Sequence, residues 1–304
     1  MAMSNTSLTC AKSFKVSHHL MRAAIITNPN KSSATRTLDE VLACLSSHGI
    51  EAALDHDSAK LRKTPSEGND DEKLGQSCDV IIVLGGDGTM LNATSRFAHF
   101  DKPVAGINTG TLGFLTTCTV DEVSELATAL DEGTFGTIRR MMLRAEIYQN
   151  DLSSSPTSYR ALNEITLTRG TTARLVEVDV FIDGDPLNHY RADGFIVTTP
   201  TGSTAYSLSA GGPLIAPSAK VIGLTPICPH SLSNRSLVVS DNSTVTLKPC
   251  VKAEHELLFS ADGGEVVPIS PGGKIIVTRA KTELPLIHLK SHSYFEKLRQ
   301  KLHW

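Results

Sequence analysis

The first part of the chain alternates short apolar runs with stretches of helical spacing. Four apolar runs predict buried strands: residues 23–26, 50–54, 79–84 and 103–107. A helix is expected to begin at a capping box at Thr37 and to end before Gly49, and a second capping box at residues 119–122 opens a helix reaching about Leu130. Residues 65–73 are polar and predict a surface loop. Alternating strands and helices predict a parallel sheet with helices on its faces.

The pattern changes after Gly133. Seven short apolar runs separated by turn signals such as Asp183-Gly184 predict strands: residues 145–148, 165–168, 175–182, 195–199, 237–239, 245–247 and 275–277. This pattern of short apolar runs and turns is typical of an all-β domain. Residues 293–302 form one amphipathic helix, with Tyr294, Phe295, Leu298 and Leu302 on a common face, which we expect to pack back on the first domain.

The expected fold class is therefore α/β plus all-β. A Rossmann-like nucleotide-binding domain with a parallel sheet occupies residues 21–135, and a β-sandwich-like domain occupies residues 136–280. Residues 281–304 form a C-terminal extension and helix. Residues 1–20 are expected to be a flexible tail. The absence of acidic residues before Asp39 leaves a weak targeting segment open as an alternative.

Composition narrows the function classes. The chain has 304 residues, with 29 Lys and Arg against 32 Asp and Glu, so a net charge of −3 argues against a nucleic-acid-binding surface. Its longest aliphatic run, residues 80–84, is far shorter than the roughly 18 apolar residues of a membrane span. The six cysteines are dispersed without a Cys-x-x-Cys pair, which predicts reduced thiols and a cytoplasmic protein: Cys10, Cys44, Cys78, Cys118, Cys228 and Cys250.

The strongest local motif is Gly85-Gly86-Asp87-Gly88-Thr89, which follows the buried strand at residues 79–84 and precedes a helical stretch. Glycines at this edge of an α/β sheet let backbone N–H groups approach phosphate oxygens. Asp87 is unexpected there because phosphate repels a carboxylate. It would be useful as the acceptor of a proton from an attacking hydroxyl. The alternative is an ordinary strand-to-helix turn.

Two further segments have both a structural and a chemical interpretation. The glycine-rich residues 106–115 would lie beside the first turn, where Phe114 either stacks on a base or, taken by itself, fills core. Asn163-Glu164 either begins a strand or grips the vicinal hydroxyls of a ribose, and spacing alone favours the strand start.

A long loop of small and hydroxylated residues follows the strand that Asp193-Gly194 precedes. It contains Thr199-Pro200-Thr201-Gly202-Ser203-Thr204-Ala205-Tyr206 and continues to Pro213. Small residues permit close backbone approach, hydroxyls form hydrogen bonds, and Tyr206 offers a stacking face, so the loop is a candidate nucleotide pocket. A polar surface loop is the alternative.

Together these motifs resemble the NAD kinase family in identity and in order, from about Met21 to Thr278, with residues 226–232 as a further match. The glycine turn is shared with diacylglycerol and sphingosine kinases and with phosphofructokinases, whereas the string from Thr199 to Tyr206 is specific. The resemblance implies transfer of the γ-phosphate of ATP to the 2′-hydroxyl of the adenosine ribose of NAD, giving NADP. It also implies a divalent metal, with Mg²⁺ the expected ion, and a homo-oligomer, either dimer or tetramer.

The resemblance also implies site residues. Asp87 would be the catalytic proton acceptor, and Asp193 would reach the nicotinamide end, potentially from a neighbouring subunit. Residues expected to bind the nucleotides are Asp87, Gly88, Phe114, Asn163, Glu164, Arg174, Arg191, Asp193, Thr204, Ala205, Tyr206, Ser207, Leu208 and Ser209. Many bacterial relatives carry Gln where this chain has Gly264, which leaves a side-chain contact there in doubt.

Rival interpretations remain at this stage. A lipid kinase of the diacylglycerol type shares the glycine turn, but Tyr206 suits a flat base and no basic membrane patch is evident. An NAD(P)-sensing module would gain nothing from Asp87 facing phosphate. We expect no protein-ligated metal, since Cys228-Pro229-His230 lacks further ligands at metal spacing. NAD against NADH, and ATP against polyphosphate, stay open.

Overall fold

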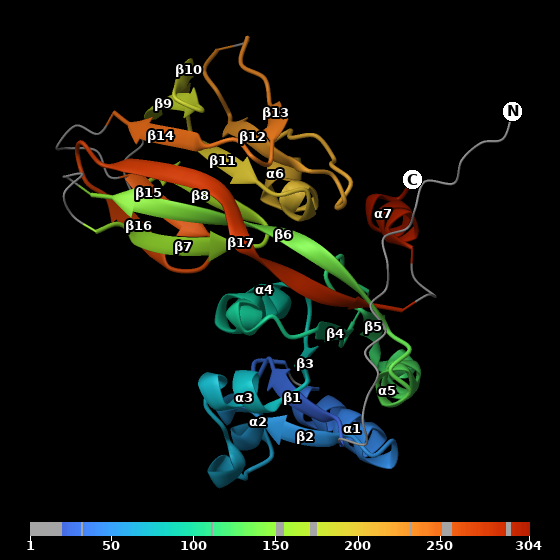
Figure 1. Ribbon diagram of the computed structural model, residues 1–304. Helices are drawn as coiled ribbons and strands as arrows, with labels where there is room; N and C mark the ends of the chain where they lie inside the picture. Colours follow the sequence, from blue (N-terminus) through green and yellow to red (C-terminus); the bar gives the residue numbers. More distant parts are fainter. Residues whose placement is uncertain are drawn as a thin grey trace, which may run out of the picture. The chain divides into compact units, whose positions relative to one another are not determined.

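The computed structural model describes residues 20–31, 33–110, 112–149, 155–170, 175–231, 233–250, 257–289 and 293–304 (Figure 1). The predicted flexible tail lies almost wholly outside these residues. The chain forms two compact units. Unit 1 contains the described residues up to Ala93, together with Lys102–Ile138 and Pro285–Trp304, and unit 2 contains Thr94–Asp101 and Arg139–Leu284.

Unit 1 is built on a parallel sheet in the order β17-β4-β3-β1-β2. Its strands are β1 (Arg22–Thr27), β2 (Glu51–Leu54), β3 (Val80–Leu84), β4 (Val104–Asn108) and the end of β17 (Lys274–His288), with the short β5 (Cys118–Thr119) beside β4. All five residues of β3 are buried, as expected for a parallel strand covered on both faces. The four predicted strands and their parallel pairing are confirmed.

Helices cover this sheet and its ends. They are α1 (Ala34–Ser47), α2 (His56–Leu61), η1 (Pro65–Glu67), α3 (Asp71–Ser77), the first part of α4 (Asp87–Phe97), η3 (Val120–Glu122), α5 (Val123–Asp131) and α7 (Tyr294–Leu302). The end of α4 and η2 (Ala98–Phe100) belong to unit 2. The apolar face of α1, including Leu38 and Leu45, joins Leu126 of α5 over Ile25 and Ile82 in one core cluster. The apolar residues that recur at helical spacing in α1 are thus the residues that pack on the sheet.

Two local predictions in unit 1 are wrong. The helix α1 begins at Ala34 rather than at Thr37, because Ser33 already occupies the N-cap position and the Thr37 N–H donates to the Ser33 carbonyl at 3.0 Å. Residues 65–73 are not all loop, since α3 begins at Asp71 and buries Leu74. In contrast, the capping box at residues 119–122 is confirmed.

Unit 2 is a sandwich of two antiparallel sheets. One contains β6 (Gly136–Tyr148), β7 (Thr157–Ala161), β9 (Val176–Ile182), β10 (Asp185–Ala192), β14 (Val245–Pro249) and the first part of β17. The other contains β8 (Glu164–Arg169), β11 (Gly194–Thr198), β12 (Val221–Ile227), β13 (Leu237–Ser240), β15 (Leu257–Ala261) and β16 (Val266–Ile269). Side chains from both sheets, including Val178, Phe195 and Phe259, form one core cluster, so the predicted sandwich is confirmed.

The C-terminal helix α7 packs on unit 1, as predicted. The Lys297 ammonium donates to the Thr116 carbonyl at 2.6 Å, and Leu298 is buried. The predicted apolar face is wrong at Phe295, which is 60% exposed. Phe295 lies about 60° around the helix from the buried Leu298, at the edge of the apolar face.

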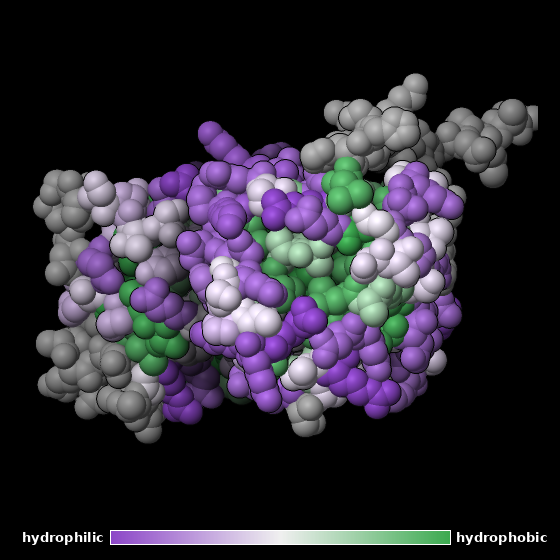
Figure 2. Space-filling view, turned by 90° about the horizontal axis from the view of Figure 1, so that it is seen from below, coloured by the Kyte–Doolittle hydropathy of each residue, from purple (hydrophilic) through white to green (hydrophobic). Residues whose placement is uncertain are grey.

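Hydrophilic residues dominate the surface seen in Figure 2 and enclose a smaller hydrophobic area. Among the described residues, no helix combines the length and the apolar character that crossing a membrane requires.

Candidate active site

In unit 1 the chain turns at the carboxyl ends of three parallel strands. The Asn28 N–H donates to the Leu84 carbonyl at 3.2 Å, and the Gly85 N–H donates to the Ile107 carbonyl at 3.0 Å. These bonds hold the segments after β1, β3 and β4 at one edge of the sheet. Ligands of open α/β sheets bind at this edge, so the predicted position of the two glycine-rich turns is confirmed.

Asp87 is the first residue of α4, and two backbone amides hold its carboxylate. The Phe114 N–H donates to Oδ2 at 3.1 Å, and the Leu115 N–H donates to Oδ1 at 3.0 Å. Each oxygen accepts one amide hydrogen, so the carboxylate has a fixed orientation while about half of its lone-pair positions are left over. The second turn thereby positions the side chain of the first.

The glycines of these turns differ in how much space surrounds them. A Cβ on Gly113 would lie 2.2 Å from Asp87 Oδ1, so only a glycine lets the second turn approach the carboxylate. A Cβ on Gly86 or Gly88 would have no neighbour within 4 Å. The space beside those two residues is open to a ligand.

Phe114 is half-buried, and its ring lies 6.5 Å from that of Tyr294 in α7. Sequence reasoning placed Tyr294 only on an apolar helix face and missed it as a neighbour of this turn. Its position about 180 residues after Phe114 gave no local signal.

In unit 2 the backbone around Asn163 and Glu164 is held by the carboxylate of Asp262. Asp262 Oδ2 accepts from the Leu162 N–H at 2.6 Å, and Oδ1 accepts from the Asn163 and Glu164 N–H groups at 2.7 and 3.0 Å. The Asp262 N–H donates in return to the Glu164 carbonyl at 3.0 Å. Sequence reasoning noted Asp262 only as part of a late Asp-Gly pair and missed this role.

The side chains of Asn163 and Glu164 are buried, with 6% and 7% of their residue surface exposed. Asn163 Oδ1 and Glu164 Oε2 are buried without a hydrogen-bond partner. Burial, reinforced by the nearby Asp262 carboxylate, raises the pKa of Glu164 to about 7. Buried acceptors without partners are costly, so among the described residues of unit 2 these two oxygens are candidate ligand contacts.

The small-residue loop packs directly on this pair. The Thr199 N–H donates to the Asn163 carbonyl at 2.8 Å, and the Thr199 hydroxyl donates to the Leu162 carbonyl at 2.6 Å. A Cβ on Gly202 would lie 2.2 Å from the Asn163 carbonyl oxygen. The predicted strand start and the specific loop string are therefore one structural cluster.

The loop continues as η4 (Thr201–Thr204) and α6 (Tyr206–Ser209). Tyr206 and Ser209 are exposed, whereas Thr204, Ala205 and Leu208 are half-buried. The Tyr206 ring, with 44% of the residue exposed, is open to a stacking partner.

Ser207 differs from its neighbours because it is fully buried, with its hydroxyl 3.2 Å from that of Thr225. A Cβ on Gly212 would lie 2.3 Å from Ser207 Oγ. Ser207 therefore fixes the loop internally, and its contact with a ligand stays a prediction.

The family models agree with this arrangement. The ATP-NAD kinase N-terminal domain matches residues 23–135 and the ATP-NAD kinase C-terminal domain matches residues 162–289. The NAD kinase of Shewanella sp. (strain MR-4) is 39% identical over 280 residues, covering 92% of this chain and 90% of that protein. The NAD kinase of Shewanella woodyi (strain ATCC 51908 / MS32) is 40% identical over 281 residues, covering 92% and 95%. This chain belongs to the NAD kinase family.

Solved structures support the same family. A yeast NADH kinase complexed with NADH matches with a TM-score of 0.85 and 27% identity, over 94% of this chain and 88% of that one. An Archaeoglobus fulgidus NAD kinase in complex with ATP matches with a TM-score of 0.71 and 26% identity, over 93% and 99%. The expected ATP-dependent phosphorylation of NAD is confirmed, and the chain is a phosphotransferase.

Two of the other predicted residues, Asp193 and Arg191, have ion-pair partners outside the Asn163 cluster. Asp193 precedes β11 and Thr199 follows it, so six residue steps of about 3.4 Å separate them by roughly 20 Å. The Asp193 carboxylate lies 3.6 Å from the Arg169 guanidinium, which sequence reasoning also missed. The exposed Arg191 pairs with Glu177 at 3.1 Å. Arg174 lies outside the described residues.

A pocket of about 410 Å³ in unit 1 contains none of the predicted site residues. It is lined by Ser124, Glu125, Thr128, Ala129, Thr134, Phe135, His288 and Leu289. The anchored carboxylate of Asp87 in unit 1 and, separately, the partnerless oxygens of Asn163 and Glu164 in unit 2 are stronger candidate ligand contacts than this cavity.

Proposed function

We propose that Asp87 accepts the proton of the adenosine ribose 2′-hydroxyl of NAD as that hydroxyl attacks the γ-phosphorus of ATP. The support is its amide-anchored carboxylate at the edge of the sheet, beside two glycines whose Cβ positions are open. In the balanced step, the new bond joins the ribose oxygen to phosphorus, the bond from phosphorus to the ADP oxygen breaks, and the hydroxyl proton goes to Asp87.

We propose that Asn163 and Glu164 bind the adenosine of NAD. The single observation that carries this assignment is that Asn163 Oδ1 and Glu164 Oε2 are buried acceptors without partners. Ribose hydroxyls and the adenine amino group are donors that would satisfy them. Tyr206 supplies a stacking face for the base, and Thr204, Ala205, Leu208 and Ser209 line the same loop.

The chemistry of the unit 1 turn fits a magnesium ion. Mg²⁺ prefers oxygen ligands, keeps several waters, and is usually held by one or two carboxylates and substrate phosphates. Asp87 offers carboxylate lone pairs beyond those that its two amide partners use. When bound with ATP, the ion would neutralise phosphate charge. Gly86 and Gly88 keep the turn open at the phosphates.

We further propose a cytoplasmic homo-oligomer in which Asp193 serves the site of a neighbouring copy. Asp193 and Thr199 lie at opposite ends of β11, so the Asp193 carboxylate is not part of the cluster around Asn163 in its own chain. The cysteines of the described residues are free thiols, which fits a reducing compartment. Specific activity that stays constant on dilution into a demonstrably monomeric range would contradict the shared site.

The direct test is to incubate the purified full chain with MgATP and NAD and to measure NADP by an NADP-specific dehydrogenase. Three parallel reactions each change one component. NADH in place of NAD tests the acceptor, polyphosphate in place of ATP tests the donor, and added EDTA tests the need for a metal. We expect NADP with MgATP and none with EDTA. Absence of any phosphorylated dinucleotide from a folded protein would overturn the proposal.

A further inference from the structure

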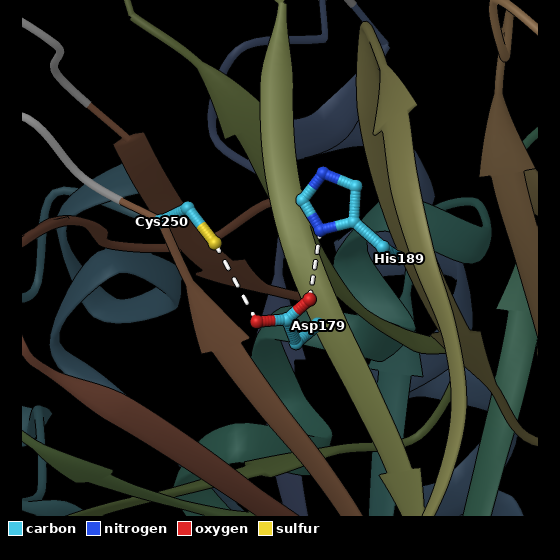
Figure 3. A group of neighbouring side chains, drawn as sticks. All are labelled: Asp179, His189 and Cys250. Carbon is cyan, nitrogen blue, oxygen red and sulfur yellow. Dashed lines mark hydrogen bonds and ion pairs between the residues drawn. The ribbon is translucent and has the colours of Figure 1, made fainter.

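Three metal-ligating side chains meet on the outer face of the β10-β9-β14 arm of unit 2 (Figure 3). His189 in β10 is the register partner of Asp179 in β9. Cys250 follows β14 on the other side of β9, where its N–H donates to the Glu177 carbonyl at 2.8 Å. Strand pairing thus brings together residues that are 10 and 71 positions apart.

The donor atoms have the chemistry of a transition-metal site. The His189 Nδ1 lies 2.7 Å from Asp179 Oδ1, and the Cys250 Sγ lies 3.6 Å from Asp179 Oδ2. All three ligand atoms lie within 4.8 Å of one another. A tetrahedral zinc ion with bonds of about 2.0–2.3 Å places its ligand atoms roughly 3.3–3.8 Å apart. The sulfur-to-carboxylate distance lies within this range, and the imidazole-to-carboxylate distance is shorter than it.

The basic side chains beside the trio have partners of their own. Lys248 is the register partner of Asp179 in β14, and its ammonium lies 4.5 Å from the centre of the Phe181 ring. Arg191 pairs with Glu177 at 3.1 Å.

The cluster is also accessible. The side chains of His189 and Asp179 are 46% and 44% exposed, so an ion can enter from solvent without opening the sandwich. Solvent can also supply a fourth ligand. A hard ion such as Mg²⁺ is a poor match, because it prefers oxygen ligands in octahedral geometry, whereas sulfur and imidazole select zinc.

We propose that Asp179, His189 and Cys250 bind one Zn²⁺ ion, with water as the fourth ligand. On binding, the Cys250 thiol loses its proton to solvent and the thiolate takes its place on the metal, while His189 binds as the neutral imidazole. The ion connects β9 to both neighbouring strands. Its expected role is to stabilise this arm of unit 2, separately from the phosphoryl transfer.

The test is a Zn²⁺ titration of the full chain in a large excess of Mg²⁺, followed by calorimetry and by metal analysis after dialysis. We expect one Zn²⁺ per chain and, in two buffers of different ionisation enthalpy, proton release on binding. Loss of a second-shell partner alone typically weakens metal affinity about 10–100-fold, so removing the ligand in Cys250→Ser should weaken it by at least about 100-fold.

A matched control is Cys228→Ser, which removes an exposed thiol two residues from a histidine and outside the proposed site. This variant should bind Zn²⁺ as the unmodified chain does. A second readout is Co²⁺ substitution, which should give a thiolate-to-cobalt charge-transfer band that Cys250→Ser loses. No stoichiometric Zn²⁺ in the unmodified chain, equal affinity in Cys250→Ser, or loss of binding in Cys228→Ser would each overturn the proposal.

His189→Ala offers an independent check that keeps the thiol. Zn²⁺ should raise the Tm of the unmodified chain but not that of this variant, because only binding to the folded state shifts the unfolding equilibrium. An equal rise in Tm for both chains would place the ion elsewhere.

Discussion

The carboxylates of Asp87 and Glu164 are held in opposite ways. Asp87 is half-exposed and accepts an amide hydrogen at each oxygen, whereas Glu164 is buried and its Oε2 has no partner. Amides that already face the Asp87 charge keep it fixed before a substrate arrives. Glu164 instead presents a desolvated acceptor, which costs the protein stability. Under the proposed function, Asp87 is the group arranged for chemistry and Glu164 the group arranged for recognition.

The largest expected effect is that of Asp87→Asn. The amide cannot accept a proton at neutral pH, so kcat for NADP formation should fall by about 10²–10⁴-fold. Steady-state kinetics at saturating NAD and MgATP measures this. One N–H of Phe114 or Leu115 will then face the new NH₂ group, which should cost about 1–3 kcal/mol of stability.

Gly113→Ala is the control for that result, because it displaces the carboxylate without removing it. Its kcat should fall less than that of Asp87→Asn. An Asp87→Asn protein that is folded by circular dichroism and turns over within about threefold of the unmodified chain, far less than the catalytic range, would end the case for Asp87 as base.

The second effect is a pH dependence of stability at Glu164. Below about pH 4.5 the residue is protonated in both states; as the pH rises, the unfolded chain loses the proton near its ordinary pKa of 4.5, while the folded chain keeps it to about 7. Stability should therefore fall by an amount on the order of 3 kcal/mol across that window and then level off.

Urea unfolding from about pH 5 to pH 8 measures this slope. Glu164→Gln should flatten it, leaving the smaller contribution of Asp262, whose pKa is raised by burial. The variant should be more stable than the unmodified chain at pH 8 and yet bind NAD more weakly. The exposed Glu40→Gln should keep the full slope. Equal slopes for all three chains would refute the buried acceptor.

The third effect comes from Gly202→Ala. The added Cβ would meet the Asn163 carbonyl oxygen at 2.2 Å, so the loop must move away from the Asn163 and Glu164 pair. Overpacking of this kind costs typically about 1–3 kcal/mol, and we expect a higher KM for NAD with little change in KM for ATP. Gly86→Ala, with open space around its Cβ, is the matched substitution and should leave Tm unchanged. A normal KM for NAD in Gly202→Ala would show that the position of the loop does not affect NAD binding by Asn163 and Glu164.

The smallest effect is that of Tyr206→Ala. A stacking face contributes equally to ground and transition states, so KM for NAD should rise while kcat is nearly unchanged. Base stacking is worth about 1–3 kcal/mol, and the 44% exposure of Tyr206 points to the lower end, a rise of roughly tenfold. A collapse of kcat at constant KM would show that Tyr206 acts elsewhere.

Local patterns predicted most of the core but not its edges. The fully apolar β3 was visible in the sequence, whereas β10 was missed because six of its eight residues face solvent or lie half-exposed in a polar run. The helix start at Ala34 was missed because Thr37 begins a capping-box sequence, whereas Ser33 caps the helix without a side-chain hydrogen bond and so has no such sequence signal. Exposed strands and helix ends depend on tertiary pairing, which local composition does not encode.

The candidate site shows the same limit. Asp87 and the Thr199 to Tyr206 string were found because their residues are adjacent in sequence. Asp262 was missed as the anchor of Asn163 because nearly 100 residues separate them. Likewise Asp179, His189 and Cys250 meet only through strand register, which short sequence spacings do not reveal. The expectation of no protein-ligated metal stays a prediction, which the proposed Zn²⁺ titration tests.

Along the chain, residues of unit 1 come both before and after Arg139–Leu284 of unit 2, and this order affects how the protein folds during synthesis. The residues that complete its core, including Ile287 and Leu298, emerge only after Arg139–Leu284. At a synthesis rate of about 5–20 residues per second, the first segments of unit 1 lack the end of β17 for on the order of ten seconds. Proteolysis of ribosome-bound chains of increasing length should show early protection of unit 2 and late protection of β1 and β3. The part of the kinase that is made first is thus the part that folds last.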